Sequence, residues 1–117
     1  MDNFKRTAGS EIVEHVFGGE GFMTRRHLLM PEEMGKNGRL FAHNTLEKGC
    51  EVGRHRHHGD NETFYILSGQ GKYLLNDEMI DVKAGDVLFV EDGQEHGMIN
   101  TGDEPLNFIA LVMYTLE

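Results

Sequence analysis

The sequence predicts an all-β fold, a jelly-roll or double-stranded β-helix barrel, for this chain of 117 residues. Two observations lead to that prediction. Fifteen glycines separate short apolar runs at regular spacing, which is typical of proteins built from many short strands. The segments between the runs contain Gly, Asn, Asp and Ser, which accept positive φ or hydrogen-bond to their own backbone in turns. Eight or nine short antiparallel strands in one chain fit a jelly roll.

We expect an N-terminal arm over residues 1–21 and a barrel domain over residues 22–117. Within the arm, the apolar residues of segment 10–17 could share one helical face, and a strand is the alternative. The glycines that follow, at positions 18, 19 and 21, end either element.

Nine strands are expected in the barrel domain, each an apolar run bounded by turn residues. They cover residues 22–30, 39–47, 51–57, 62–68, 71–76, 78–83, 86–90, 96–101 and 106–115. The last of them is apolar on both faces, as in strands that are covered on both sides. The interior of the barrel covers one of these faces. A second subunit is expected to cover the other, so we predict a homodimer.

Three histidines and one glutamate have the spacing of a metal site on the wall of such a barrel. His55 and His57 stand two apart on an expected strand, so both side chains point to one face. Glu62 opens the next strand, after the turn-like residues 58–61, and His96 opens a later one. Three imidazole nitrogens and one carboxylate oxygen suit a first-row divalent ion with open coordination positions. We therefore predict one divalent transition metal ion (Fe, Mn, Ni, Co or Zn) held by these four side chains.

Strand alternation also predicts the wall around that ion. If Glu62 and His96 face the interior, so do Phe64 and Met98. These two are candidate substrate-binding residues, with core packing as the alternative for each. An arginine from the early strands could reach the mouth of the pocket. No inward-facing Asp, Lys or Tyr can be assigned an acid–base role, so the catalytic residues are unknown.

The glycines around the ligands extend the pattern to two blocks. The first block fits G-x5-H-x-H-x4-E-x6-G at Gly49, His55, His57, Glu62 and Gly69. The second fits G-x5-P-x-G-x2-H-x3-N at Gly85, Gly93, His96 and Asn100, with Glu91 where proline is usual. Over residues 49–100 the chain therefore resembles the cupin family. The resemblance implies a metal and a pocket inside a jelly-roll barrel, but no single reaction.

Composition limits the partners. The formal net charge of −9 repels phosphate backbones and anionic lipid headgroups, so neither nucleic acid nor membrane is expected. The N-terminal residues precede no apolar segment, and we expect a cytoplasmic protein. The single cysteine, Cys50, excludes an intrachain disulfide and a zinc–thiolate site. It is expected to be a small buried residue.

Two functions remain open from the sequence. The first is a metalloenzyme of the oxygenase, isomerase, decarboxylase or lyase type, acting on a small polar or anionic molecule. The alternative is a metal-dependent binding module without catalysis. A divalent ion with three neutral imidazoles and one carboxylate gives a site charge of about +1. Either function therefore predicts an anionic or chelating small-molecule ligand.

Overall fold

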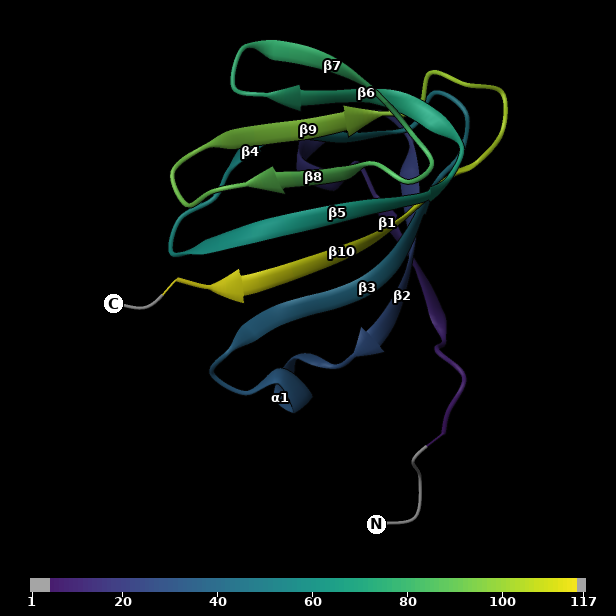
Figure 1. Ribbon diagram of the computed structural model, residues 1–117. Coiled ribbons are helices and arrows are strands. Elements are labelled where there is room, and N and C mark those ends of the chain that lie inside the picture. Colours follow the sequence, from purple (N-terminus) through teal and green to yellow (C-terminus); the bar gives the residue numbers. More distant parts are fainter. Residues whose placement is uncertain (1–4, 116–117) are drawn as a thin grey trace.

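The computed structural model describes residues 5–115, and two antiparallel β-sheets that face each other make up the fold (Figure 1). The strands are β1 (Ser10–Glu14), β2 (Phe22–Leu29), β3 (Gly38–Leu46), β4 (Glu51–Arg56), β5 (Asp60–Ser68), β6 (Gln70–Leu75), β7 (Glu78–Lys83), β8 (Val87–Val90), β9 (Glu95–Ile99) and β10 (Leu106–Tyr114). A short 3-10 helix, η1 (Val16–Gly18), follows β1, and one helical turn, α1 (Pro31–Met34), follows β2. The prediction of an all-β jelly-roll barrel is confirmed.

All nine strands expected from the sequence form, with ends that differ by at most two residues. Segment 10–17 forms a strand followed by the 3-10 turn, so the strand alternative is the one observed. Asp60 and Asn61 belong to β5, whereas the sequence placed them in a turn. Strand β1 pairs with β2 along its whole length, from Ser10 opposite Arg26 to Glu14 opposite Phe22. The division into an arm and a barrel domain remains a prediction.

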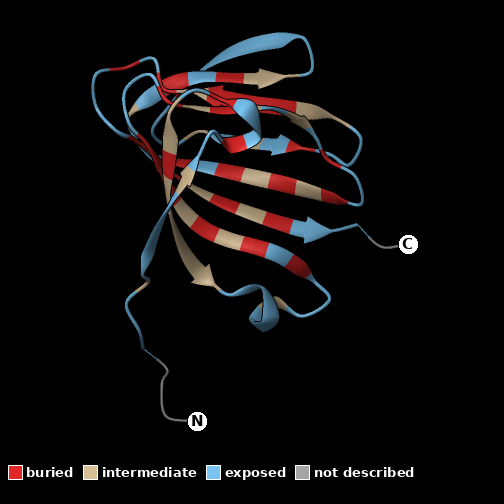
Figure 2. Cartoon of the chain, turned by 180° about the vertical axis from the view of Figure 1, so that it is seen from behind, coloured by how far each residue is buried: buried red, intermediate tan, exposed pale blue. Residues whose placement is uncertain are grey.

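The larger sheet has the strand order β1-β2-β3-β10-β5-β8, and the smaller one has the order β4-β9-β6-β7. Side chains alternate between the interior and the outer face, which gives the banding of buried and less buried residues along the strands (Figure 2). In β10, Phe108 and Ala110 point inward, while Ile109 and Leu111 lie on the outer face. The expected inward direction of Glu62, Phe64, His96 and Met98 is also confirmed by their burial.

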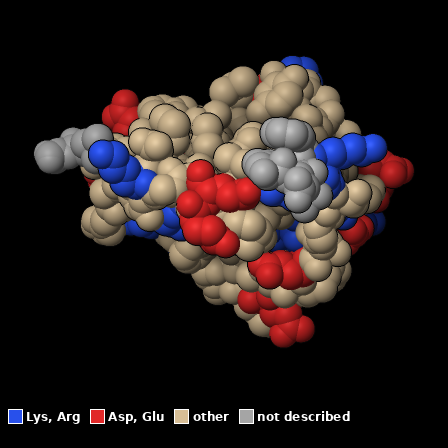
Figure 3. Space-filling model, turned by 90° about the horizontal axis from the view of Figure 1, so that it is seen from below, with Lys and Arg blue, Asp and Glu red and all other residues tan. Residues whose placement is uncertain are grey.

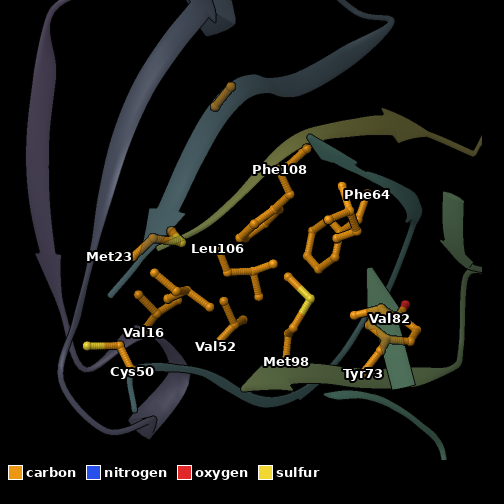
Figure 4. Close-up of a cluster of buried hydrophobic side chains, with 14 of the residues drawn as sticks. Val16, Met23, Cys50, Val52, Phe64, Tyr73, Val82, Met98, Leu106 and Phe108 are labelled. Carbon is orange, nitrogen blue, oxygen red and sulfur yellow. The ribbon is translucent and has the colours of Figure 1, made fainter. Parts of the chain in front are cut away.

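Apolar side chains from both sheets fill the space between them (Figure 4). Phe64 and Phe108 lie against each other in the larger sheet, with ring centroids 4.7 Å apart. Met98 of the smaller sheet is 1% exposed and belongs to the same cluster. Cys50 is buried at its edge, as expected. This packed layer occupies one part of the interior and leaves another part for the polar side chains of the site.

A β-bulge in β4 places the first ligand. The register between β4 and β9 shifts between Val52 and His55, so both of these side chains face the interior although they are three residues apart. Gly53 lies in the bulge, and a Cβ there would overlap the carbonyl oxygen of Phe17. The bulge and the turn at η1 therefore fit together only because residue 53 has no side chain.

Charged residues are spread over the outer surface. Figure 3 shows acidic side chains across the face seen from below, with lysine and arginine at its sides. Among residues 5–115, no helix has both the length and the apolar character that a membrane crossing requires.

Candidate metal centre

The structure brings His55, His57, Glu62 and His96 together. One possible ligand atom from each lies within 4.8 Å of the others. His55 and His96 face each other as a pair on β4 and β9, and His57 directly follows β4. Glu62 comes from β5 in the opposite sheet. The group thus joins the two layers of the fold, and three of its four members are buried.

Each imidazole is oriented by a partner of its Nδ1 atom. His55 Nδ1 is 2.8 Å from the carbonyl oxygen of Gly53, and His57 Nδ1 is 2.6 Å from Asp60 Oδ1. Both partners are acceptors, so these two Nδ1 atoms carry the proton and donate it. His96 Nδ1 is 2.8 Å from the hydroxyl of Tyr73. All three rings consequently present Nε2 to the centre of the group.

The four ligand atoms have the spacing of a metal site. The Nε2 atom of His96 is 3.1 Å from the Nε2 atoms of both other histidines and 3.1 Å from Glu62 Oε1. His57 Nε2 is 3.2 Å from the same oxygen. For metal–ligand bonds of about 2.1 Å, an octahedral edge is about 3.0 Å and a tetrahedral edge about 3.4 Å. The four separations of 3.1–3.2 Å lie between these two values, three of them closer to the octahedral edge, so the group could hold a divalent ion.

The surroundings shift the pKa values of three of the four candidate ligands. Burial would raise the pKa of Glu62, but hydrogen bonds from His57 and His96 outweigh it and lower that pKa to about 2. Burial lowers the pKa of His55 to about 4. For His57, burial also acts downward, yet its hydrogen bonds to Glu62 and Asp60 raise its pKa overall. The carboxylate is therefore charged and His55 is neutral near pH 7.

A small cavity of about 20 Å³ adjoins the group, which is room for about one water molecule. Its lining includes His55, Glu62, Phe64, Arg25 and Phe17. The Phe17 ring stacks on His55 with centroids 3.7 Å apart and an interplanar angle of 12°, although 61% of Phe17 is exposed. Residues 15–21, which contain η1, therefore cover one side of the site.

The two candidate substrate-binding residues lie in different surroundings. Phe64 lines this cavity and stacks on the His96 ring at 5.1 Å, so it is in position to touch a bound molecule. Met98 is not part of that lining and is buried in the apolar cluster between the sheets. A ligand contact for Phe64 stays a prediction, and the position of Met98 favours the core-packing alternative.

Of the arginines on the early strands, Arg25 reaches the cavity. Arg54 and Arg56, which alternate with the ligands, are exposed and pair with Glu95 at 2.7 and 2.8 Å. Arg39 donates to Asp60 Oδ2 at 2.9 Å and so supports the carboxylate that holds His57.

Little in the sequence indicates the supporting residues Asp60, Tyr73 and Phe17. Asp60 comes three residues after His57, but residues 58–61 have the composition of a turn. Alternation with the charged Lys72 could have assigned Tyr73 to the interior, and the structure shows Tyr73 and its strand neighbour Gly71 both buried. For Phe17 no pattern in the sequence indicates a contact with His55, because that contact depends on how the η1 turn folds back on β4.

Comparison with known protein families agrees with this site. A family model described as the cupin domain matches residues 42–113, which is 72 of the 117 residues and includes all four candidate ligands. The chain belongs to the cupin family. This cupin keeps the histidines and glutamate of both sequence blocks, and the structure shows why: they come together at one point between the sheets.

A curated protein and a solved structure, both from Thermotoga maritima, are similar to this cupin over most of its length. One, named an oxalate-binding protein, is 40% identical over 103 residues, which is 88% of this chain and 85% of the relative. The crystal structure of a predicted oxalate decarboxylase superposes with a TM-score of 0.90 at 38% identity, covering 92% of this chain and 94% of that one. The polyketide cyclase RemF from Streptomyces resistomycificus shares the fold, with a TM-score of 0.77, 20% identity, and coverage of 94% and 79%.

Proposed function

We propose that this cupin binds one divalent metal ion through His55, His57, Glu62 and His96 and uses it to bind a small dicarboxylate such as oxalate. The observation that carries the proposal is the convergence of three oriented Nε2 atoms and one carboxylate oxygen within 4.8 Å, with four of their six separations at 3.1–3.2 Å. The near-octahedral spacing favours Mn, Fe, Co or Ni over four-coordinate zinc. Bound there, the ion would supply positive charge and open coordination positions for oxygen ligands.

Charge supports an anionic ligand. Glu62 is held ionised, and the neutral histidines leave a site charge of about +1 once a divalent ion is present. That charge lies among buried side chains, where a ligand oxygen with negative charge is favoured over water. Similarity at 40% identity to a protein named for binding oxalate points to the same class of ligand.

Binding without turnover is the function that the lining favours over the metalloenzyme. Apart from the candidate ligands, the described residues around the cavity include no Asp, Glu, Lys or Tyr that could act as a separate acid or base. Tyr73 donates to or accepts from His96 rather than facing the cavity, and burial raises its pKa well above the ordinary range. Proton transfer to a reacting carbon would therefore lack a dedicated side chain.

Calorimetric titration of oxalate into manganese-loaded and metal-free protein tests the proposal. We expect binding to the loaded form and none to the metal-free form, together with near-complete loss of metal from His57→Ala and His96→Ala. A parallel assay for formate and carbon dioxide distinguishes binding from decarboxylation. Equal oxalate affinity with and without metal, or full metal content in both variants, would contradict the proposed site. Formation of formate would show that the protein is a decarboxylating enzyme and not only a binding protein.

A further inference from the structure

Arg25 and Arg26 are neighbours on β2 but have different surroundings. Arg25 lines the cavity beside His55 and Glu62, on the inward side of the strand with Met23. Its Nε donates to the buried Asn44 Oδ1 at 3.3 Å. Arg26 lies on the other side of the strand and donates to Thr45 Oγ1 at 3.1 Å. The chain thus offers one arginine at the site and a matched arginine one residue away from it.

The guanidinium of Arg25 has no carboxylate partner among residues 5–115. Arg6, Arg39, Arg54 and Arg56 each have an Asp or Glu oxygen within 4.0 Å, whereas Arg25 and Arg26 have none in this part of the chain. Burial lowers the pKa of Arg25, and the charge of Glu62 opposes this effect. A partly buried guanidinium with N–H groups left over is suited to bind an anion that enters the cavity.

A second cavity meets the first at this side chain. Arg25 also lines a groove of about 330 Å³ between residues 6–11 and β2, and His27 lines it two residues further on. The Nδ1 atom of His27 is buried and has no hydrogen-bond partner in the part of the chain that the structure describes. Arg25 therefore lines both the groove and the cavity beside the candidate metal centre.

We infer that Arg25, oriented by Asn44, binds a carboxylate oxygen of the ligand that the metal does not take, and so selects carboxylates over other chelators. The inference rests on the proposed function and names the side chain that recognises its ligand class. A carboxylate has two oxygens, so an oxalate that coordinates an ion through one oxygen of each group keeps two for hydrogen bonds. The planar guanidinium matches that arrangement.

The test compares Arg25→Gln with the matched control Arg26→Gln, both loaded with manganese and checked for metal content. Oxalate and acetohydroxamate, an oxygen chelator without a carboxylate, are titrated calorimetrically into each. Loss of a hydrogen-bonded ion pair should weaken oxalate binding about 10- to 100-fold in Arg25→Gln and leave acetohydroxamate binding within about twofold. Arg26→Gln should match the unmodified protein with both ligands.

Other results overturn the inference in distinguishable ways. If Arg25→Gln keeps its oxalate affinity, or loses affinity for both ligands equally, Arg25 does not recognise the carboxylate. If Arg25→Gln loses its metal, the arginine supports Glu62 instead. If the unmodified loaded protein binds acetohydroxamate but not oxalate, the proposed ligand class fails as well. Should Arg25→Gln not fold, Arg25→Lys, which keeps the charge but not the planar pair of donors, should still lower the ratio of oxalate to acetohydroxamate affinity severalfold.

Discussion

At the scale of single residues, the three candidate histidines differ in what holds them. His55 relies on a backbone carbonyl, His96 on the Tyr73 hydroxyl, and His57 on the carboxylate of Asp60. A carboxylate partner makes an imidazole a better metal ligand, because it fixes the ring and increases the basicity of the other nitrogen. Asp60 is itself 5% exposed and is held by Arg39.

Replacing Asp60 with asparagine should therefore weaken metal binding by about 10- to 100-fold while leaving the four ligands in place. Asparagine keeps an acceptor for His57 Nδ1 but loses the charge and the ion pair with Arg39. Competition against a coloured chelator measures the dissociation constant. Asp86→Asn, in the turn before β8, is the matched control and should retain the original affinity. An unchanged dissociation constant for Asp60→Asn would show that His57 needs no such support.

The histidine pKa values also predict how metal affinity depends on pH. Protons compete with the metal for Nε2, so affinity falls as the pH drops through the pKa of each ligand. The pKa of His57 is raised above 6.5, whereas that of His55 is lowered to about 4. Loss of affinity should accordingly begin above pH 6.5, with His57, and His55 should contribute only near pH 4. Chelator competition between pH 8 and pH 4 checks this, and affinity that stays constant down to pH 5 would contradict it.

At the scale of elements, the η1 turn has an unusual backbone conformation. His15 and Phe17 have positive φ values of 50° and 49°, a conformation that costs residues with side chains about 1–2 kcal/mol each. The backbone holds this turn through hydrogen bonds from Gly18 N to His15 O and from His15 N to Gly21 O. We expect the stacking of the Phe17 ring on His55 to offset part of this strain. Because the cavity beneath is about 20 Å³, a ligand larger than water requires part of the lining to move, and we expect the exposed Phe17 ring to be that part.

Replacing Phe17 with alanine should open the site and relax the limit on ligand size. We expect the affinities for malonate and succinate to rise at least threefold relative to that for oxalate, and oxalate to associate faster, because the ring no longer has to be displaced. Stopped-flow and calorimetric measurements on loaded protein give both quantities. Met79→Ala removes an exposed side chain from β7 and should change neither. An unaltered order of affinities would mean that Phe17 does not limit access.

Strand positions and the ligand set were predictable from the sequence because both depend on local alternation and on glycine spacing. For example, alternation predicts that His55 and His57 point to the same face. It does not predict that Val52 also points to that face, since the bulge depends on the contact between Gly53 and Phe17, residues 36 positions apart in the chain. Arg25 could be assigned to a strand but not to a face, because the facing of β2 is set by its pairing with β1 and β3.

At the scale of the whole molecule, the outer face of the larger sheet is mostly apolar over β10, β5 and β8. Tyr65 lies between Ile109 and Val87 in one row across the strands, and Thr63 lies between Leu111 and Phe89 in the next. Val87 is 64% exposed, and several other large apolar side chains of this face are also exposed. Monomeric proteins rarely leave such a continuous patch in water. A second copy of the chain is the partner that we predict for it.

Leu111→Asp should convert the predicted dimer to a monomer or an insoluble chain, because a carboxylate in an apolar interface loses its hydration without gaining a partner. Ile109→Asp should act in the same way. Light scattering at micromolar concentration measures the mass. Ile80→Asp, on β7 of the smaller sheet, is the matched control and should leave the mass unchanged. A monomeric unmodified protein would refute the prediction.

The position of Glu62 in one sheet and of the three histidines beside the other has a consequence for folding. A bound ion would be a cross-link between two layers that are joined at this end by the His57–Asp60 hydrogen bond and by apolar packing. Each tenfold increase in free metal above the dissociation constant should then add about 1.4 kcal/mol to the free energy of unfolding. The unfolding temperature of the protein without other ligands would thus rise with the concentration of free metal around it.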